Sequence, residues 1–276
     1  MQIKNKQRLF LLGKVILFLL TYIVLGFSTG IIAQNIFKGD RFYDQLPFDL
    51  LNYAITIFVL LLFVKIIDKE NIVSGVGLSL KNHIKEFFSG GIAGVICIVI
   101  GFFIVIKLNF KQVEFSSYWI EKADYFLIGT LITMCSVIME EVIFRGYILR
   151  KLYEKFPLIV SIVLSSIPFT LFHLLNPNIT FWGVSTTFLA GILLGILYLT
   201  TKNIWLACGF HFSWNYMQVL LGFNVSGGGR MPSILSLNFE EMNAFNGGYY
   251  GLEGSYLCTI ILIILIIAYG RNMFKK

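Results

Sequence analysis

The chain has 276 residues, of which 57% are apolar and only 13% are charged, and its mean hydropathy is +0.79. Soluble domains contain about 25% charged and about 45–50% apolar residues. The composition therefore excludes a soluble enzyme, a disordered chain and a disulfide-stapled secreted domain, and it predicts an all-α polytopic membrane protein. The net charge is +7, and we expect the basic residues that cause it to flank membrane spans. We therefore expect no nucleic-acid partner.

The apolar residues gather in runs of the length that a helix needs to cross the hydrocarbon core, which is about 20 residues. The sequence predicts about eight transmembrane helices, at Leu9–Ile32, Phe48–Ile67, Phe87–Lys107, Tyr125–Tyr147, Leu158–Leu175, Phe181–Thr200, Ile204–Phe223 and Tyr256–Tyr269. No linker or repeat divides the chain, so residues 1–276 are expected to form a single transmembrane domain. The small residues Gly90 and Gly94, four positions apart, favour close helix packing.

The basic residues are distributed unequally between the two ends of these runs. Sixteen of the 22 Lys and Arg residues fall on the side that carries both termini, and six fall on the other side. Because cytoplasmic loops carry the excess of Lys and Arg, we expect both termini to be cytoplasmic.

The fourth run contains two adjacent carboxylates, Glu140 and Glu141, followed by Arg145. A carboxylate in the bilayer costs about 2.5–3.5 kcal/mol on insertion scales, so its presence asks for an explanation. Glu141 and Arg145 are spaced i,i+4, with the acid first, and are predicted to form a supporting ion pair. Glu140 points about 100° away around the helix and has no partner nearby in the sequence, so it is left free to act as a general base.

Two of the three histidines also fall inside apolar runs, His173 in the fifth and His211 in the seventh. His211 and Asn215 are spaced i,i+4 and leave one face of their helix. Counted from the nearest turns, Glu140 lies ~21 Å deep, His173 ~24 Å, His211 ~12 Å and Asn215 ~18 Å. Side chains on three helices can therefore converge in one cavity within the membrane.

These residues, in this order, resemble the three-motif signature of the CAAX-protease and bacteriocin-processing family, whose members are intramembrane proteases related to the Ras-converting CAAX endopeptidases. The motifs are Glu140-Glu141-x-x-Phe144-Arg145, Phe169-x-x-x-His173 and His211-x-x-x-Asn215, within a core of about 124–223. The resemblance implies that Glu140 is the catalytic glutamate and His173 its partner in activating water. It also implies that His211 and Asn215 complete the site, with Glu141 and Arg145 as the supporting pair.

The involvement of a metal is left open by the sequence. Glu140, His173 and His211 have the donor types of a three-ligand catalytic zinc site. If all three were ligands, however, no general base would remain, and no HExxH helix is present. We therefore favour a glutamate mechanism without a cofactor, with a divalent metal such as zinc as the alternative.

The expected function is an intramembrane endopeptidase that hydrolyses a membrane-associated peptide or protein, in the cytoplasmic membrane of a prokaryote. Two alternatives remain: an immunity or regulatory membrane protein that binds a partner without cleaving it, and a proton-coupled transporter. The long loop at 225–254 is either a lid or a mobile connection, and the pair Glu240-Glu241 within it is expected to be solvated. The sequence does not identify the substrate or the oligomeric state.

Overall fold

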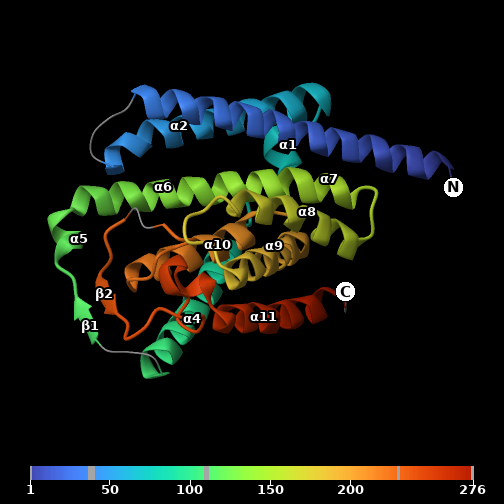
Figure 1. Ribbon diagram of the computed structural model, residues 1–276. Coiled ribbons are helices and arrows are strands. Elements are labelled where there is room, and N and C mark those ends of the chain that lie inside the picture. The colour runs from blue at the N-terminus through green and yellow to red at the C-terminus, as the bar shows by residue number, and fades with distance from the viewer. Residues whose placement is uncertain (1, 37–40, 109–111, 229–230, 275–276) are drawn as a thin grey trace.

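The computed structural model describes residues 2–36, 41–108, 112–228 and 231–274. Lys38, Lys111, Arg230, Lys275 and Lys276, which contribute to the charge count, lie outside the described residues. Within the described ranges the chain is predominantly helical and contains almost no sheet, which confirms the all-α polytopic fold (Figure 1). The long helices are α1 (Gln2–Ile36), α2 (Arg41–Leu60), α4 (Ile84–Leu108), α6 (Ala123–Glu141), α8 (Leu158–His173), α9 (Phe181–Thr201), α10 (Trp205–Leu220) and α11 (Tyr256–Phe274).

Shorter elements extend or join these helices. The α2 helix continues into the π-helical η1 (Leu61–Ile67), and α6 continues through the π-helical η2 (Val142–Leu149) into α7 (Arg150–Tyr153). The connecting elements are α3 (Ile72–Gly75), α5 (Tyr118–Glu121), η3 (Gly248–Tyr250) and η4 (Leu252–Gly254). Strands β1 (Gln112–Phe115) and β2 (Leu235–Asn238) pair antiparallel, with Gln112 opposite Asn238, in segments that the sequence analysis treated as loops.

Each of the eight predicted apolar runs lies largely within a helix. Five of the described helical segments are long and apolar enough to cross a membrane, and α8 and α11 contain shorter apolar stretches. The 16 residues of α8 extend only about 24 Å, which is less than a bilayer core of about 30 Å. The number of spans therefore stays a prediction. Large apolar side chains are exposed around the bundle, among them Phe10, Phe103 and Leu127, as expected for a surface that faces lipid.

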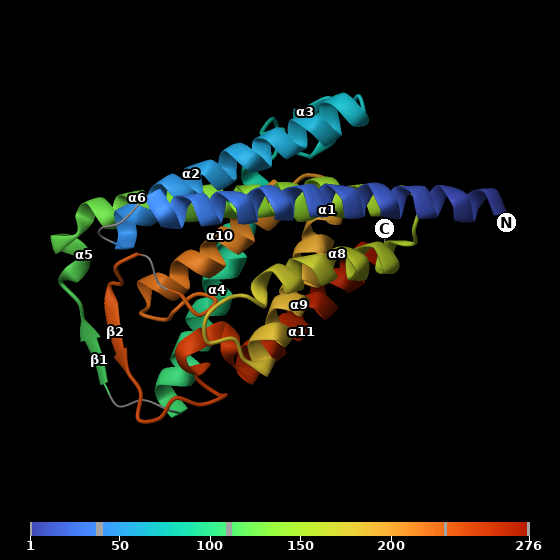
Figure 2. The same ribbon diagram turned by 45° about the horizontal axis from the view of Figure 1, so that its top comes forward.

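The helices lie in layers around the long α6–η2–α7 segment. The α1–α2 pair lies on one side of this segment, and α8, α9, α10, α4 and α11 lie on the other, as Figure 1 shows; Figure 2 gives a second view of the latter group. The N-terminal end of α1 and the C-terminal end of α11 lie at the same end of the bundle. The described segments 112–122, 174–180, 221–228 and 231–255 lie at the opposite end, which we call the loop end.

Glycines allow the helix that carries His211 and Asn215 to pack closely. A Cβ at Gly90 would collide with the carbonyl oxygen of Leu206, and one at Gly94 with Oγ of Ser213. On α10 itself, a Cβ at Gly209 would collide with the carbonyl oxygen of Phe87. The predicted close packing at Gly90 and Gly94 is thus confirmed, and it holds α10 against α4.

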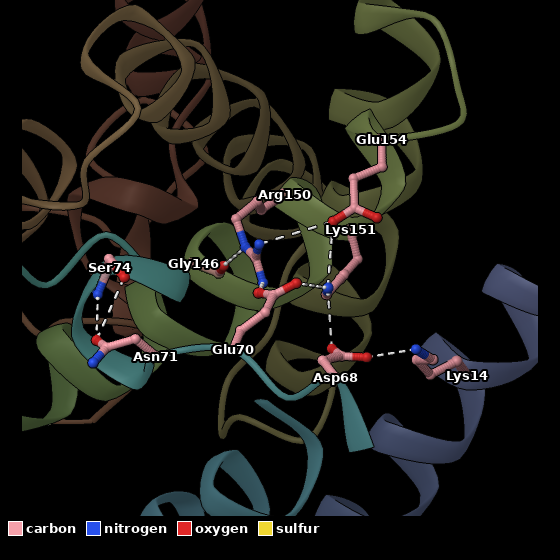
Figure 3. A network of polar contacts seen from close by, with 9 residues as sticks. All are labelled: Lys14, Asp68, Glu70, Asn71, Ser74, Gly146, Arg150, Lys151 and Glu154. Carbon is pink, nitrogen blue, oxygen red and sulfur yellow. Dashed lines mark hydrogen bonds and ion pairs between the residues drawn. The ribbon is translucent and has the colours of Figure 1, made fainter. Parts of the chain in front are cut away.

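An ion network at the end away from the loop end joins α1 to α7 (Figure 3). Asp68 lies between Lys14 on α1 and Lys151 on α7, with Nζ–Oδ distances of 2.5 and 3.1 Å. Glu70 accepts from Lys151 at 2.7 Å and from Arg150 at 2.5 Å. Because both acids follow directly after η1, the network fixes the α1–α2 pair against the central helix.

Candidate active site

A cavity of about 360 Å³ lies among α6, α8, α9 and α10 and extends toward the loop end of the bundle. Four of the predicted site residues line this cavity together: Glu140, His173, His211 and Asn215. Each lies on the helix where the sequence analysis expected it. Glu140 lies on α6, His173 lies on α8, and His211 and Asn215 lie on α10. Apolar side chains such as Phe144, Phe169 and Phe210 form much of the remaining wall.

The two adjacent glutamates have different environments. Glu141 is fully buried, and its Oε1 accepts a hydrogen bond from Nη1 of Arg145 at 3.0 Å, so the predicted ion pair is present. The same Oε1 lies 2.9 Å from Nδ1 of His211. Glu140 faces the cavity, and its Oε2 has no hydrogen-bond partner among the described residues. Nε2 of His211 lies 4.0 Å from this oxygen.

Arg145 lies behind the cavity rather than in its wall. Only 2% of its surface is exposed, its guanidinium carbon lies 4.2 Å from the centre of the Phe169 ring, and its Nη2 donates to the carbonyl of Gly191 at 3.4 Å. Arg145 belongs to the π-helical segment η2, and π-helical turns are frequent at functional sites. The charge of Arg145 is therefore compensated by Glu141 and does not reach the cavity directly.

Each of the two histidine rings is anchored by a hydrogen bond at Nδ1, so its Nε2 is not used for this anchor. In His173, Nδ1 lies 2.8 Å from the carbonyl oxygen of Phe169, and because a carbonyl can only accept, Nδ1 carries the proton. In His211, Nδ1 likewise donates to the Glu141 carboxylate. In the neutral form of each ring, Nε2 then has a free lone pair. Both rings can accept a proton at Nε2 without losing their anchor.

Asn215 lies one turn beyond His211 on α10 and lines the cavity, and its amide makes no hydrogen bond with the described residues. A carboxamide with free N–H groups in a largely apolar cavity can donate to a developing negative charge. The cavity thus combines a free carboxylate, two anchored imidazoles and a free amide.

The proposed zinc ligands do not come together as a set. Among the described residues, no group of three or more His, Cys, Asp or Glu side chains lies close enough to hold a metal ion. The donor types and the Nδ1 anchors suit zinc, but the placement of Glu140, His173 and His211 does not form a three-ligand centre.

Two further parts of the cavity wall were missed by the sequence analysis. Tyr22 of α1 lines the cavity and packs against Phe172 with ring centres 5.8 Å apart. From the loop end, Val225, Ser226 and Glu253 also line it. No sequence signal points to Glu253, because the side chains that bond to it are 27 to 39 residues away.

The comparisons with known proteins agree with the motif pattern. The family model described as Type II CAAX prenyl endopeptidase Rce1-like matches residues 122–217. A protein of Bacillus subtilis (strain 168) named "Putative membrane peptidase YdiL" is 27% identical over 223 residues, which cover 74% of this chain and 86% of that protein. No solved structure matches the chain at a significant level. The matched region contains every motif residue, so the comparisons support a membrane protease of the CAAX-protease and bacteriocin-processing family.

Proposed function

We propose that the protein is an intramembrane endopeptidase in which Glu140 activates water for attack on a peptide bond. The observation that carries the proposal is the unpartnered Oε2 of Glu140 in the wall of a cavity that also exposes His173, His211 and Asn215. A general base must have a free oxygen within reach of the water it deprotonates. Glu141 also has an unpartnered Oε2, but it is fully buried and does not line the cavity, and its Oε1 is occupied by both Arg145 and His211.

In the proposed reaction, Glu140 takes a proton from water while Nε2 of His173 accepts a hydrogen bond from the same water and orients it. The water oxygen bonds to the carbonyl carbon, and the carbonyl oxygen becomes an oxyanion. Asn215 donates an N–H to this oxyanion, and His211 in its protonated form donates from Nε2. Glu140 then returns the proton to the amide nitrogen, and the C–N bond breaks to release a carboxylic acid and an amine.

Glu141 and Arg145 support this site without touching the substrate. The Glu141 carboxylate fixes the His211 ring and stabilises its protonated form, because it accepts from Nδ1. Arg145 holds the Glu141 carboxylate in place through its hydrogen bond to Oε1. No step of the proposed reaction passes through a metal, because the residues do not form a three-ligand centre.

The proposal is tested with two strains that express the protein or its Glu140→Gln variant at equal levels. Quantitative mass spectrometry of membrane and secreted peptides is expected to find cleavage products only with the unchanged protein. Such products would also identify the substrate. Identical peptides in both strains, with the phenotype of the protein kept by the variant, would favour a protein that binds a partner without cleaving it.

A further inference from the structure

The wall of the cavity at the loop end carries a second carboxylate, Glu253, which the proposed reaction does not use. Glu253 belongs to η4, lines the cavity and is only 8% exposed. Its Oε1 accepts from Nε1 of Trp214 at 3.0 Å and from Nε2 of Gln218 at 3.2 Å. Its Oε2 accepts from the backbone N–H and the hydroxyl of Ser226, at 2.9 and 2.7 Å. The carboxylate therefore connects η4 with α10 on one side and with Ser226 on the other, and these bonds hold it in a fixed position.

All four hydrogen-bond donors to Glu253 are electrically neutral. They solvate the carboxylate, but they do not cancel its charge. No Lys or Arg is among the described residues that line the cavity. The buried cation closest to the site, Arg145, is paired with Glu141.

The cavity thus contains an excess of negative charge. Glu253 faces the cavity without a cationic partner, whereas Glu140 lies 4.0 Å from Nε2 of His211, whose protonated form offsets one of the two negative charges and leaves the other. In a cavity with largely apolar walls, such a charge is weakly screened and attracts cations strongly. A cationic group that leaves water for this cavity would find compensation there, whereas an anionic group would meet repulsion.

We propose that Glu253 is a specificity-determining residue that selects peptides with a cationic group, a Lys or Arg side chain or a free amino group, close to the bond that is cleaved. This inference rests on the proposed peptidase function and adds the class of substrate. Glu253 acts on the substrate through its charge, since its lone pairs are already used by Trp214, Gln218 and Ser226.

The test uses the full-length protein in lipid nanodiscs and lipid-anchored model peptides in which each position of a short segment is in turn Lys, Gln or Glu. For the unchanged protein, we expect kcat/KM to be greater for Lys than for Gln at one or two positions, on the order of tenfold, and lowest for Glu. The preference should weaken as the salt concentration rises. This measurement needs no variant and so does not depend on the folding of one.

The variant Glu253→Gln removes the charge at nearly constant size, and the ratio of kcat/KM for Lys over Gln is expected to fall toward one. Glu241→Gln is the matched control, because Glu241 lies on the same segment but is exposed and outside the cavity wall, and it should keep the ratio. Equal rates for Lys and Gln with the unchanged protein would overturn the inference. So would a Glu253→Gln variant that slows all peptides by the same factor, because Glu253 would then only hold the loop. If no peptide is cleaved, the proposed function itself fails, and the inference fails with it.

Discussion

Nδ1 of His211 on α10 lies 2.9 Å from Oε1 of Glu141 on α6, and the same oxygen accepts a hydrogen bond from Arg145. This shared oxygen joins two helices that are separated by more than 60 residues of chain. It also gives the two adjacent glutamates separate tasks, since the carboxylate that holds the helices together cannot also be free in the cavity. Each glutamate has an unpartnered Oε2, but of the two only Glu140 lines the cavity.

The first prediction concerns the stability contributed by Glu141. The Glu141→Gln variant should lower the free energy of unfolding by about 3–5 kcal/mol, because it leaves the buried Arg145 without a counter-charge. Thermal unfolding in detergent would measure this as a reduced Tm. Glu140→Gln is the control, and its Tm should change much less, since Glu140 Oε2 has no partner to lose. Similar Tm losses in both variants would contradict the division of tasks.

The second prediction concerns Asn215, whose amide is free in the cavity. If it donates to the oxyanion, Asn215→Ala should lower kcat by about 100-fold or more and change KM little. The measurement is steady-state cleavage of a substrate found in the proteomic comparison. Ser213→Ala on the same helix is the control, because Ser213 bonds to the carbonyl of Phe210 and does not line the cavity. A large change in KM with kcat intact would instead assign Asn215 to ground-state binding.

How much the sequence could predict depends on how local each relationship is. The i,i+4 rule predicted the Glu141–Arg145 pair correctly, because both residues lie on one continuous helical segment. The contact between Glu141 and His211 could not be predicted, since it depends on how α10 is positioned against α4 and α6.

The loop end was the least predictable part. Glu253 was not singled out in the sequence, although its four donors come from Trp214, Gln218 and Ser226. The 225–254 loop was expected to be a lid or a mobile connection, and some of its described residues, among them Ser226 and Glu253, form a wall of the cavity. No regular spacing of residues in the sequence indicates the contacts of Glu253 or the cavity wall formed by the loop, because these contacts join irregular backbone to a helix far away in the chain.

The third prediction addresses the alternative of a metal. Activity of the purified protein should survive dialysis against a strong chelator such as 1,10-phenanthroline, and added zinc should not increase it. The reason is that Glu140, His173 and His211 do not form a three-ligand centre, while Glu140 has a free oxygen to act as a base. Loss of activity with the chelator, restored by a stoichiometric amount of zinc, would replace the glutamate mechanism with a metal-dependent one.

The fourth prediction concerns pH and the ion network of Figure 3. Burial alone would raise the pKa of Asp68 and of Glu70, but Lys14 and Lys151 at Asp68, and Lys151 and Arg150 at Glu70, lower each pKa below its usual value of 3.8 or 4.5. Since the folded protein favours the ionised acids, the network stabilises the fold above about pH 4.5. This contribution is lost as the pH falls through the lowered pKa values.

The corresponding measurement compares Tm in detergent for the unchanged protein and the Asp68→Asn variant across a pH series. The difference in Tm should be greatest near neutral pH and shrink below about pH 4, where Asp68 is protonated first in the unfolded chain, and it should disappear once the pH lies below the lowered pKa of Asp68 in the folded chain. A difference that stays constant down to pH 3 would show that Asp68 acts through packing rather than through its charge.

The last prediction concerns the side of the membrane to which the cavity extends. Sixteen of the 22 Lys and Arg residues fall on the side of the termini, which predicts that this side is cytoplasmic and that the loop end faces outward. Because Ser226 and Glu253 of the loop end line the cavity, substrates would then reach the cavity from the outer side.

Two cysteine variants, Glu241→Cys and Lys81→Cys, test this orientation. Both positions are exposed, Glu241 at the loop end and Lys81 at the opposite end. The background variant is Cys135→Ser, because the other three cysteines are buried and poorly reactive. In intact cells, a membrane-impermeant maleimide should label the Glu241→Cys variant and should label Lys81→Cys only after the cells are opened. The reverse pattern would place the cavity mouth on the cytoplasmic side, and the substrate would have to be sought among cytoplasmic or inner-leaflet peptides.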